Sequence, residues 1–186
     1  MEPTIREPAV AGAFYPGSAT ELERQVQQLI PVQPERHDLL ACVAPHAGYV
    51  YSGGVAGELY GHLDVPGRVI VLGPNHTGAG APVAVAPHET WHTPFGEQRV
   101  DGELASLLVE ASPTAVFDAN AHWREHSLEV QLPFLATRRP DLSFLPICLG
   151  HLGLDQCVEL GHILASLILG LDQPVGLVAS SDMSHY

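Results

Sequence analysis

The stretch RVIVLGPNH, residues 68 to 76, begins as a run of branched apolar residues and closes on a glycine, a proline and a histidine. A short apolar run punctuated in this way is typical of a buried strand. Two other stretches repeat the pattern: LLACVAPH (39 to 46) and VGLVASSDMSH (175 to 185). The carboxyl ends of parallel strands lie at one edge of a sheet, where open α/β folds bind their ligands. We therefore expect the three closing histidines to meet at that edge.

The three closing histidines are His46, His76 and His185. Neutral imidazole is a good ligand for iron, copper and zinc, and two histidines with one carboxylate leave open positions on Fe(II). A lone histidine in a loop is more often a hydrogen-bonded structural residue. Three of them at one edge predict a metal site or an acid-base site.

Apolar runs of strand length alternate with helical patterns along the chain, which is typical of βαβ units around a mostly parallel sheet. Length and composition suit a single domain over residues 1–186. The strand candidates are residues 39–44, 68–72, 82–86, 114–117, 142–148 and 175–180. The helix candidates are residues 20–30, 53–63, 102–111, 127–138 and 154–169, with Thr20 and Glu23 as a capping box for the first and Ser127 as the N-cap of the fourth.

Charge and hydropathy exclude several classes of partner. The formal net charge is −13, from 21 acidic and 8 basic residues, and such a chain would repel nucleic acid. The apolar run at 163–171 is too short to span a bilayer, and the amino terminus lacks the pattern of a secretory signal. We expect a cytoplasmic protein with no membrane and no nucleic-acid partner.

A competing motif is H-x-x-E-H, formed by His122, Glu125 and His126. In one class of zinc proteases this motif places two zinc ligands one helical turn apart, with the glutamate as general base. Here Ser127 is expected to begin the helix, so the histidines would precede it instead of lying on it. The alternative for His126 is a structural residue or one at the rim of the pocket.

Six motifs follow one another along the chain: REPAVAGAFYP (6–16), APHAGYVYSG (44–53), LGPNH (72–76), WHTPFGEQRVD (91–101), EHSLEVQLPFL (125–135) and SSDMSHY (180–186). In this order they resemble the motifs of the MEMO family, whose bacterial and archaeal members are called AmmeMemoRadiSam system protein B. The resemblance covers essentially the whole chain and implies a three-layer αβα fold, similar to the class III extradiol dioxygenases of the LigB type.

The resemblance implies a role for each matching residue. His46 and His76 match the two metal-binding histidines of the family, while Asp182 and His185 match residues that line the same pocket. His185 corresponds to the acid-base histidine of the dioxygenases, oriented here by Asp182. The family's remaining ligand is a cysteine downstream of the SSDMSH motif, and no residue of this sequence matches it. We therefore expect a chain truncated at its carboxyl end relative to the family, with an incomplete metal site and self-association through the truncated side.

These inferences combine into two functional hypotheses. In the first, His46 and His76 hold Fe(II), with copper or zinc as alternatives, and His185 moves a proton during oxidation of a small aromatic or metal-chelating substrate. In the second, the cleft is a vestige of the dioxygenase site, and the protein is a noncatalytic module that binds a metal or a peptide.

Overall fold

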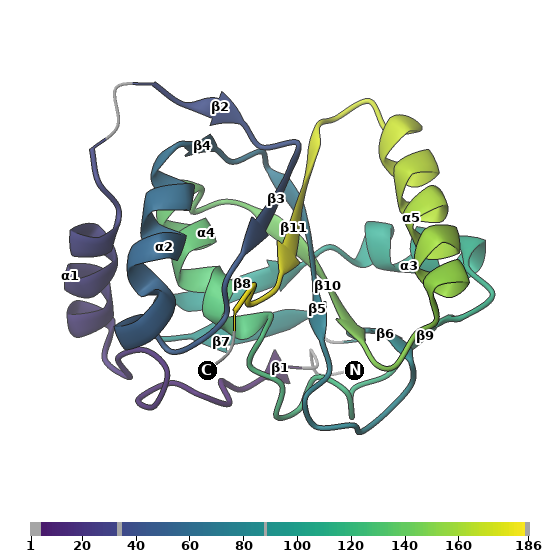
Figure 1. Cartoon of the computed structure of the whole chain (residues 1–186), viewed down its shortest axis with the longest axis horizontal. Helices are drawn as coiled ribbons and strands as arrows, with labels where there is room; N and C mark the ends of the chain where they lie inside the picture. Colours follow the sequence, from purple (N-terminus) through teal and green to yellow (C-terminus); the bar gives the residue numbers. More distant parts are fainter. Residues whose placement is uncertain (1–4, 33–34, 88, 185–186) are drawn as a thin grey trace.

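The computed structural model describes residues 5–32, 35–87 and 89–184. A mostly parallel sheet of nine strands forms the centre of this described chain, with helices on both faces (Figure 1). Helices α1, α2 and α4 pack together on one face, and α3 and α5 pack together on the other. The three-layer αβα fold expected from the sequence is therefore confirmed.

The elements follow one another as strands and helices in near alternation. In chain order they are β1 (Ile5–Arg6), α1 (Ala19–Leu29), β2 (His37–Asp38), β3 (Ala41–Ala44), α2 (Tyr49–Gly61), β4 (Leu63–Asp64), β5 (Arg68–Pro74), β6 (Val83–Val85), β7 (Thr90–Thr93), β8 (Gly96–Val100), α3 (Gly102–Ala111), β9 (Ala115–Phe117), the 3-10 turn η1 (Glu129–Gln131), α4 (Leu132–Arg138), β10 (Ser143–Leu149), α5 (Leu154–Leu169) and β11 (Val175–Ser180).

Strand β5 lies at the centre of the sheet, between β10 and β11, and is parallel to both. On its far side β11 pairs with β3, again parallel, with Ser180 opposite Ala44. Antiparallel pairing is confined to β6 with β10 and to the β7–β8 hairpin among the described strands. The carboxyl ends of β3, β5 and β11 therefore lie at one edge, as the sequence pattern predicts.

Each face of the sheet has its own apolar core. Under α1, α2 and α4 the core includes Val71, Phe134 and Phe144, and under α3 and α5 it includes Ile70 and Leu164. Val71 and Ile70 are neighbours on β5 that face opposite sides, so this strand is buried on both faces, as parallel strands are. None of the helices in the described part of the chain has the length and apolarity that a membrane crossing requires.

The start of α2 differs from the sequence expectation, because the helix begins at Tyr49 and not at residue 53. A Cβ atom at Gly53 would lie 2.9 Å from Leu29 Cδ1, and one at Gly57 would clash with the Leu29 carbonyl group. These glycines therefore permit α1 to approach α2 closely, and that requirement is not visible in a local pattern.

Two predicted helix caps were also wrong. The capping residue of α1 is Ser18, whose hydroxyl accepts a hydrogen bond from the Glu21 backbone N–H at 3.3 Å, in place of Thr20. Ser127 does not cap the fourth helix, because its hydroxyl donates to the Pro74 carbonyl oxygen at 2.9 Å. The helical segment begins two residues later, as a 3-10 turn that continues into α4.

The amino-terminal arm is attached to the domain through Arg6, which is fully buried. Its guanidinium donates to Glu129 Oε2 at 2.7 Å and to the carbonyl oxygens of His122 and Glu125, also at 2.7 Å. It lies over the ring of the buried Trp91, 4.0 Å from the ring centroid. A buried arginine needs acceptors for its donors, and these contacts supply them.

Glu129 completes the attachment from the other side. Its carboxylate, also fully buried, accepts hydrogen bonds from the backbone N–H groups of Ala9 and Val10 and from the Tyr15 hydroxyl. Burial raises the pKa of Tyr15 well above its ordinary value, with the Glu129 carboxylate adding to the effect, so the hydroxyl keeps its proton as a donor.

We predict that Arg6→Met lowers the free energy of unfolding by about 3–5 kcal/mol, because it leaves the buried Glu129 carboxylate without its cation. Urea denaturation followed by circular dichroism measures the change. Arg24→Met, at an exposed position of α1, is the matched control and should change stability by less than about 0.5 kcal/mol. Equal stability of the two variants would contradict the structural role of the buried pair.

Candidate metal centre

Three polar residues follow three neighbouring strands by the same two-residue step. His46 follows Ala44 of β3, His76 follows Pro74 of β5, and Asp182 follows Ser180 of β11. Because these strands are parallel and in register, the step places all three residues at the same edge. The structure thus brings together His46, His76 and Asp182 of the residues predicted from the sequence, whereas His185 lies outside the described residues.

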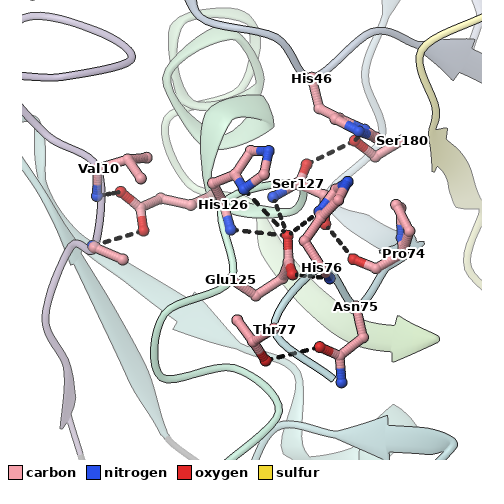
Figure 2. A network of polar contacts seen from close by, with 12 residues as sticks. Val10, His46, Pro74, Asn75, His76, Thr77, Glu125, His126, Ser127 and Ser180 are labelled. Carbon is pink, nitrogen blue, oxygen red and sulfur yellow. Dashed lines mark hydrogen bonds and ion pairs between the residues drawn. The ribbon is translucent and has the colours of Figure 1, made fainter. Parts of the chain in front are cut away.

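A third imidazole joins His46 and His76 from a different part of the chain. His126 lies in the loop between β9 and η1, and its ring stacks on that of His76 at a centroid distance of 4.5 Å (Figure 2). Each of the three rings offers a nitrogen within 4.8 Å of the other two. Two imidazole nitrogens on one metal ion lie about 3.4 Å apart in tetrahedral geometry, so modest side-chain rotation would bring the set onto one ion.

One buried carboxylate, Glu125, organises two of these histidines (Figure 2). Its Oε1 accepts a hydrogen bond from His76 Nδ1 at 2.9 Å, and its Oε2 accepts one from the His76 backbone N–H at 2.6 Å. The backbone N–H groups of His126 and Ser127 also donate to Oε1. Burial by itself would raise the pKa of Glu125, but these hydrogen bonds outweigh it and hold the pKa below its ordinary value.

The charge on Glu125 fixes the proton of the His76 ring. An ionised carboxylate can only accept hydrogen bonds, so His76 Nδ1 must carry the proton. The other ring nitrogen, Nε2, then keeps the lone pair that a metal ion requires. A carboxylate that orients a ligating histidine through its second nitrogen is a recurrent arrangement in metal sites.

His46 is the most buried of the three histidines, with 3% of its surface exposed. Its Nδ1 lies 3.2 Å from the Ser180 hydroxyl, and its backbone N–H donates to Asp182 Oδ1 at 2.7 Å. The other carboxylate oxygen, Oδ2, lies 3.7 Å from His46 Nε2. Asp182 therefore anchors the loop that presents His46 and adds a negative charge beside the imidazole cluster.

Burial also favours the neutral form of His46 and His126. It lowers the pKa of His46 below the ordinary value; the nearby Asp182 opposes this, and the His76 and His126 rings reinforce it. The pKa of His126 is lowered by the same cause, with Glu125 opposing. Only neutral imidazole can ligate a metal, so the lowered pKa values keep both rings able to ligate at lower pH than an exposed histidine.

A close approach of two segments makes this geometry possible. A Cβ atom at Gly73, near the end of β5, would lie 3.0 Å from both Ser127 Oγ and a methyl group of Leu128. Glycine at this position therefore lets the segment that carries His126 pack directly against the strand that carries His76.

The protease motif H-x-x-E-H does not form a metal site. His122 is fully buried, its Nε2 lies 3.1 Å from the Ala84 carbonyl oxygen, and its ring packs edge-on against Trp91. It lies in a turn before η1, as the sequence analysis expected, and is not part of the histidine cluster. His126, which sequence reasoning left as a structural or pocket-rim residue, is instead the third member of the cluster.

We predict that the metal-free protein loses stability as the pH falls below about 6.5, the ordinary pKa of histidine in an unfolded chain. His46 and His126 have lower pKa values when folded, so in the window between the two values the unfolded chain binds more protons. The free energy of unfolding should therefore decrease on acidification through this window. Urea denaturation at a series of pH values measures the slope. His126→Gln removes one titrating group and should reduce it; an unchanged slope would contradict the assignment.

Comparison with known proteins agrees with the motifs. The chain matches the family model for Memo-like proteins over residues 6–186. It is 42% identical to a MEMO1 family protein of Aquifex aeolicus and 43% identical to one of Methanosarcina barkeri, in each case over 184 residues that cover 98% of this chain and 68% of the relative. A MEMO1 family protein of Archaeoglobus fulgidus is 42% identical with the same coverage. The chain belongs to the Memo-like family.

Proposed function

We propose that this protein binds one first-row transition-metal ion through His46, His76 and His126. The observation that carries the proposal is the convergence of three imidazole nitrogens from three separate loops to within 4.8 Å of one another. Imidazole suits iron, copper, zinc and nickel, and it is a poor choice for magnesium or calcium. Three protein ligands leave coordination positions open, as catalytic metal sites do.

The surroundings of the three histidines support a metal rather than a purely structural cluster. His76 gives Nδ1 to Glu125, which leaves its Nε2 available to a metal ion. The acidic groups Glu125 and Asp182 flank the cluster and would offset the charge of a divalent cation.

With Fe(II) as the bound ion, we propose oxidation of a small aromatic or metal-chelating substrate, for which the ion would supply the redox chemistry; copper and zinc are the alternatives. An open cavity of about 800 Å³ lies beside the His46 loop and supports a substrate of this class. Its wall combines apolar side chains with one carboxylate, from Val43, Tyr51, Val55, Met183 and Asp182.

In this proposal the protein's own groups bind and deprotonate the substrate. The apolar wall would hold the body of the molecule. Asp182, anchored by the backbone N–H groups of His46 and Ala47, lies in the wall of the cavity and would orient His185. His185 would hold and move the substrate proton, as the resemblance to the family implies.

The second candidate is a noncatalytic module that binds a metal or a peptide. One observation favours it: Tyr51 and Met183, in the wall of the cavity, are 85% and 86% exposed. Such side chains offer a surface that an apolar segment of a peptide would cover.

We predict that the purified protein binds one equivalent of Co²⁺, used as a spectroscopic probe, and that His46→Ala, His76→Ala and His126→Ala each weaken binding. The affinity for Co²⁺ should fall by about 10- to 100-fold or more. Removal of an outer-shell hydrogen-bond partner alone has an effect of this size, and here a ligand itself is removed. His151→Ala, at an exposed position after β10, is the matched control. Wild-type affinity in His126→Ala would remove His126 from the proposed ligand set.

A dioxygen electrode distinguishes the two candidates. If the protein is an oxidising enzyme, the Fe(II)-loaded form should consume dioxygen in the presence of a catechol, and His46→Ala should abolish this. Stoichiometric metal binding with no more dioxygen uptake than the His46→Ala variant would instead favour the noncatalytic module.

A further inference from the structure

Ser180, at the end of β11, forms three short polar contacts although it is almost completely buried. Its Oγ lies 2.6 Å from the Ser127 carbonyl oxygen, 2.9 Å from Gln131 Nε2 and 3.2 Å from His46 Nδ1. A serine hydroxyl has one proton to donate and two lone pairs to accept with. Of the three contacts, Ser180 can therefore donate in one and accept in two.

The proton of Ser180 goes to Ser127. A backbone carbonyl oxygen can only accept, so the shortest of the three contacts is a hydrogen bond donated by Ser180. The hydroxyl then has only its lone pairs left for Gln131 and His46.

Gln131 donates to Ser180, and its orientation is fixed by other neighbours. The same nitrogen, Nε2, lies 2.9 Å from the carbonyl oxygen of Pro45, which can only accept. The amide oxygen of Gln131 accepts a hydrogen bond from the Tyr60 hydroxyl at 3.0 Å. Gln131 Nε2 therefore donates to one lone pair of the Ser180 hydroxyl, and the second lone pair faces the His46 ring.

His46 must then donate from Nδ1. If Nδ1 were bare, its lone pair would face a lone pair of Ser180 in a buried place where neither could reach water, which is costly. The opposite tautomer would carry its proton on Nε2, facing Asp182 Oδ2 at 3.7 Å, which is too long for a hydrogen bond. The network therefore favours a proton on Nδ1 and a bare Nε2.

We infer that Ser180, held by Ser127 and Gln131, is a positioning residue that fixes the neutral His46 ring with its proton on Nδ1, so that Nε2 keeps the lone pair that a metal ion requires. Ser180 does for His46 what Glu125 does for His76, with a neutral hydroxyl in place of a carboxylate. The consequence for metal affinity rests on the proposed function, whereas the tautomer does not.

Nitrogen-15 spectra of the metal-free protein test the tautomer directly. At a pH where the ring is neutral, long-range proton–nitrogen correlations distinguish a protonated Nδ1 from a protonated Nε2. We expect His46 in the wild-type protein to carry its proton on Nδ1. A proton on Nε2 would overturn the inference, whatever the protein does with metals.

Ser180→Ala then tests whether the serine is the cause. The variant removes the hydroxyl that accepts from His46 Nδ1, so the tautomer should shift toward a proton on Nε2 and the dissociation constant for Co²⁺ should rise about 10- to 100-fold. Ser181→Ala, whose backbone N–H pairs with Ala44, is the matched control and should keep the wild-type tautomer and affinity.

The outcomes separate this inference from the proposed function. An unchanged tautomer in folded Ser180→Ala would overturn the role of Ser180, even if Co²⁺ still binds. Failure of the wild-type protein to bind Co²⁺ would contradict the proposed function and leave the tautomer result standing. If Ser180→Ala does not fold, the wild-type spectrum still decides whether the ring is fixed as inferred.

Discussion

The buried ion pair between Arg6 and Glu129 is the interaction on which the candidate site depends. The loop between β9 and η1 has no strand or long helix of its own, so its shape must come from tertiary contacts. Arg6 supplies them by binding two carbonyl oxygens of this loop, while Glu129 binds the backbone of the amino-terminal arm in return. A buried pair of this kind is stable only when its remaining donors and acceptors are also matched, and here they are. The loop is thereby held at a defined position above the sheet.

That loop, together with the 3-10 turn η1 that follows it, supplies several of the groups around the three histidines. Glu125 accepts hydrogen bonds from the His76 ring and from the backbone N–H of His126. The Ser127 carbonyl oxygen accepts a hydrogen bond from the Ser180 hydroxyl, and Gln131 Nε2 donates one to the same hydroxyl. One short segment thus orients the rings that β3 and β5 deliver as well as the one that it carries itself. The amino-terminal arm, although far from the site in sequence, is connected to its geometry through the Glu129 carboxylate and the two carbonyl oxygens that Arg6 binds.

The sheet determines where the site residues that follow its strands lie. Parallel strands in register end at one edge, so the same two-residue step after each strand places His46, His76 and Asp182 side by side. At this edge burial favours the neutral form of His46 and His126, and the carboxylates of Glu125 and Asp182 supply hydrogen-bond acceptors. The arrangement combines rigid placement by the sheet with orientation by hydrogen bonds, which is what a site with open coordination positions requires.

The sequence by itself determined the fold class, the strands β5, β10 and β11, the limits of α3 and α5, and the meeting of His46 with His76. The elements follow from apolar periodicity, which is a property of neighbouring residues. The meeting of the two histidines follows from the general rule that parallel strands share an edge. Only the tertiary structure decided that His126 joins the cluster, that Glu125 and Ser180 orient its members, and that the glycines of α2 serve helix packing. Arg6 and Glu129 are separated by 123 residues, and Ser180 and Ser127 by 53. No local pattern encodes which buried donor will face which acceptor across such distances, because packing of the whole chain selects the partners.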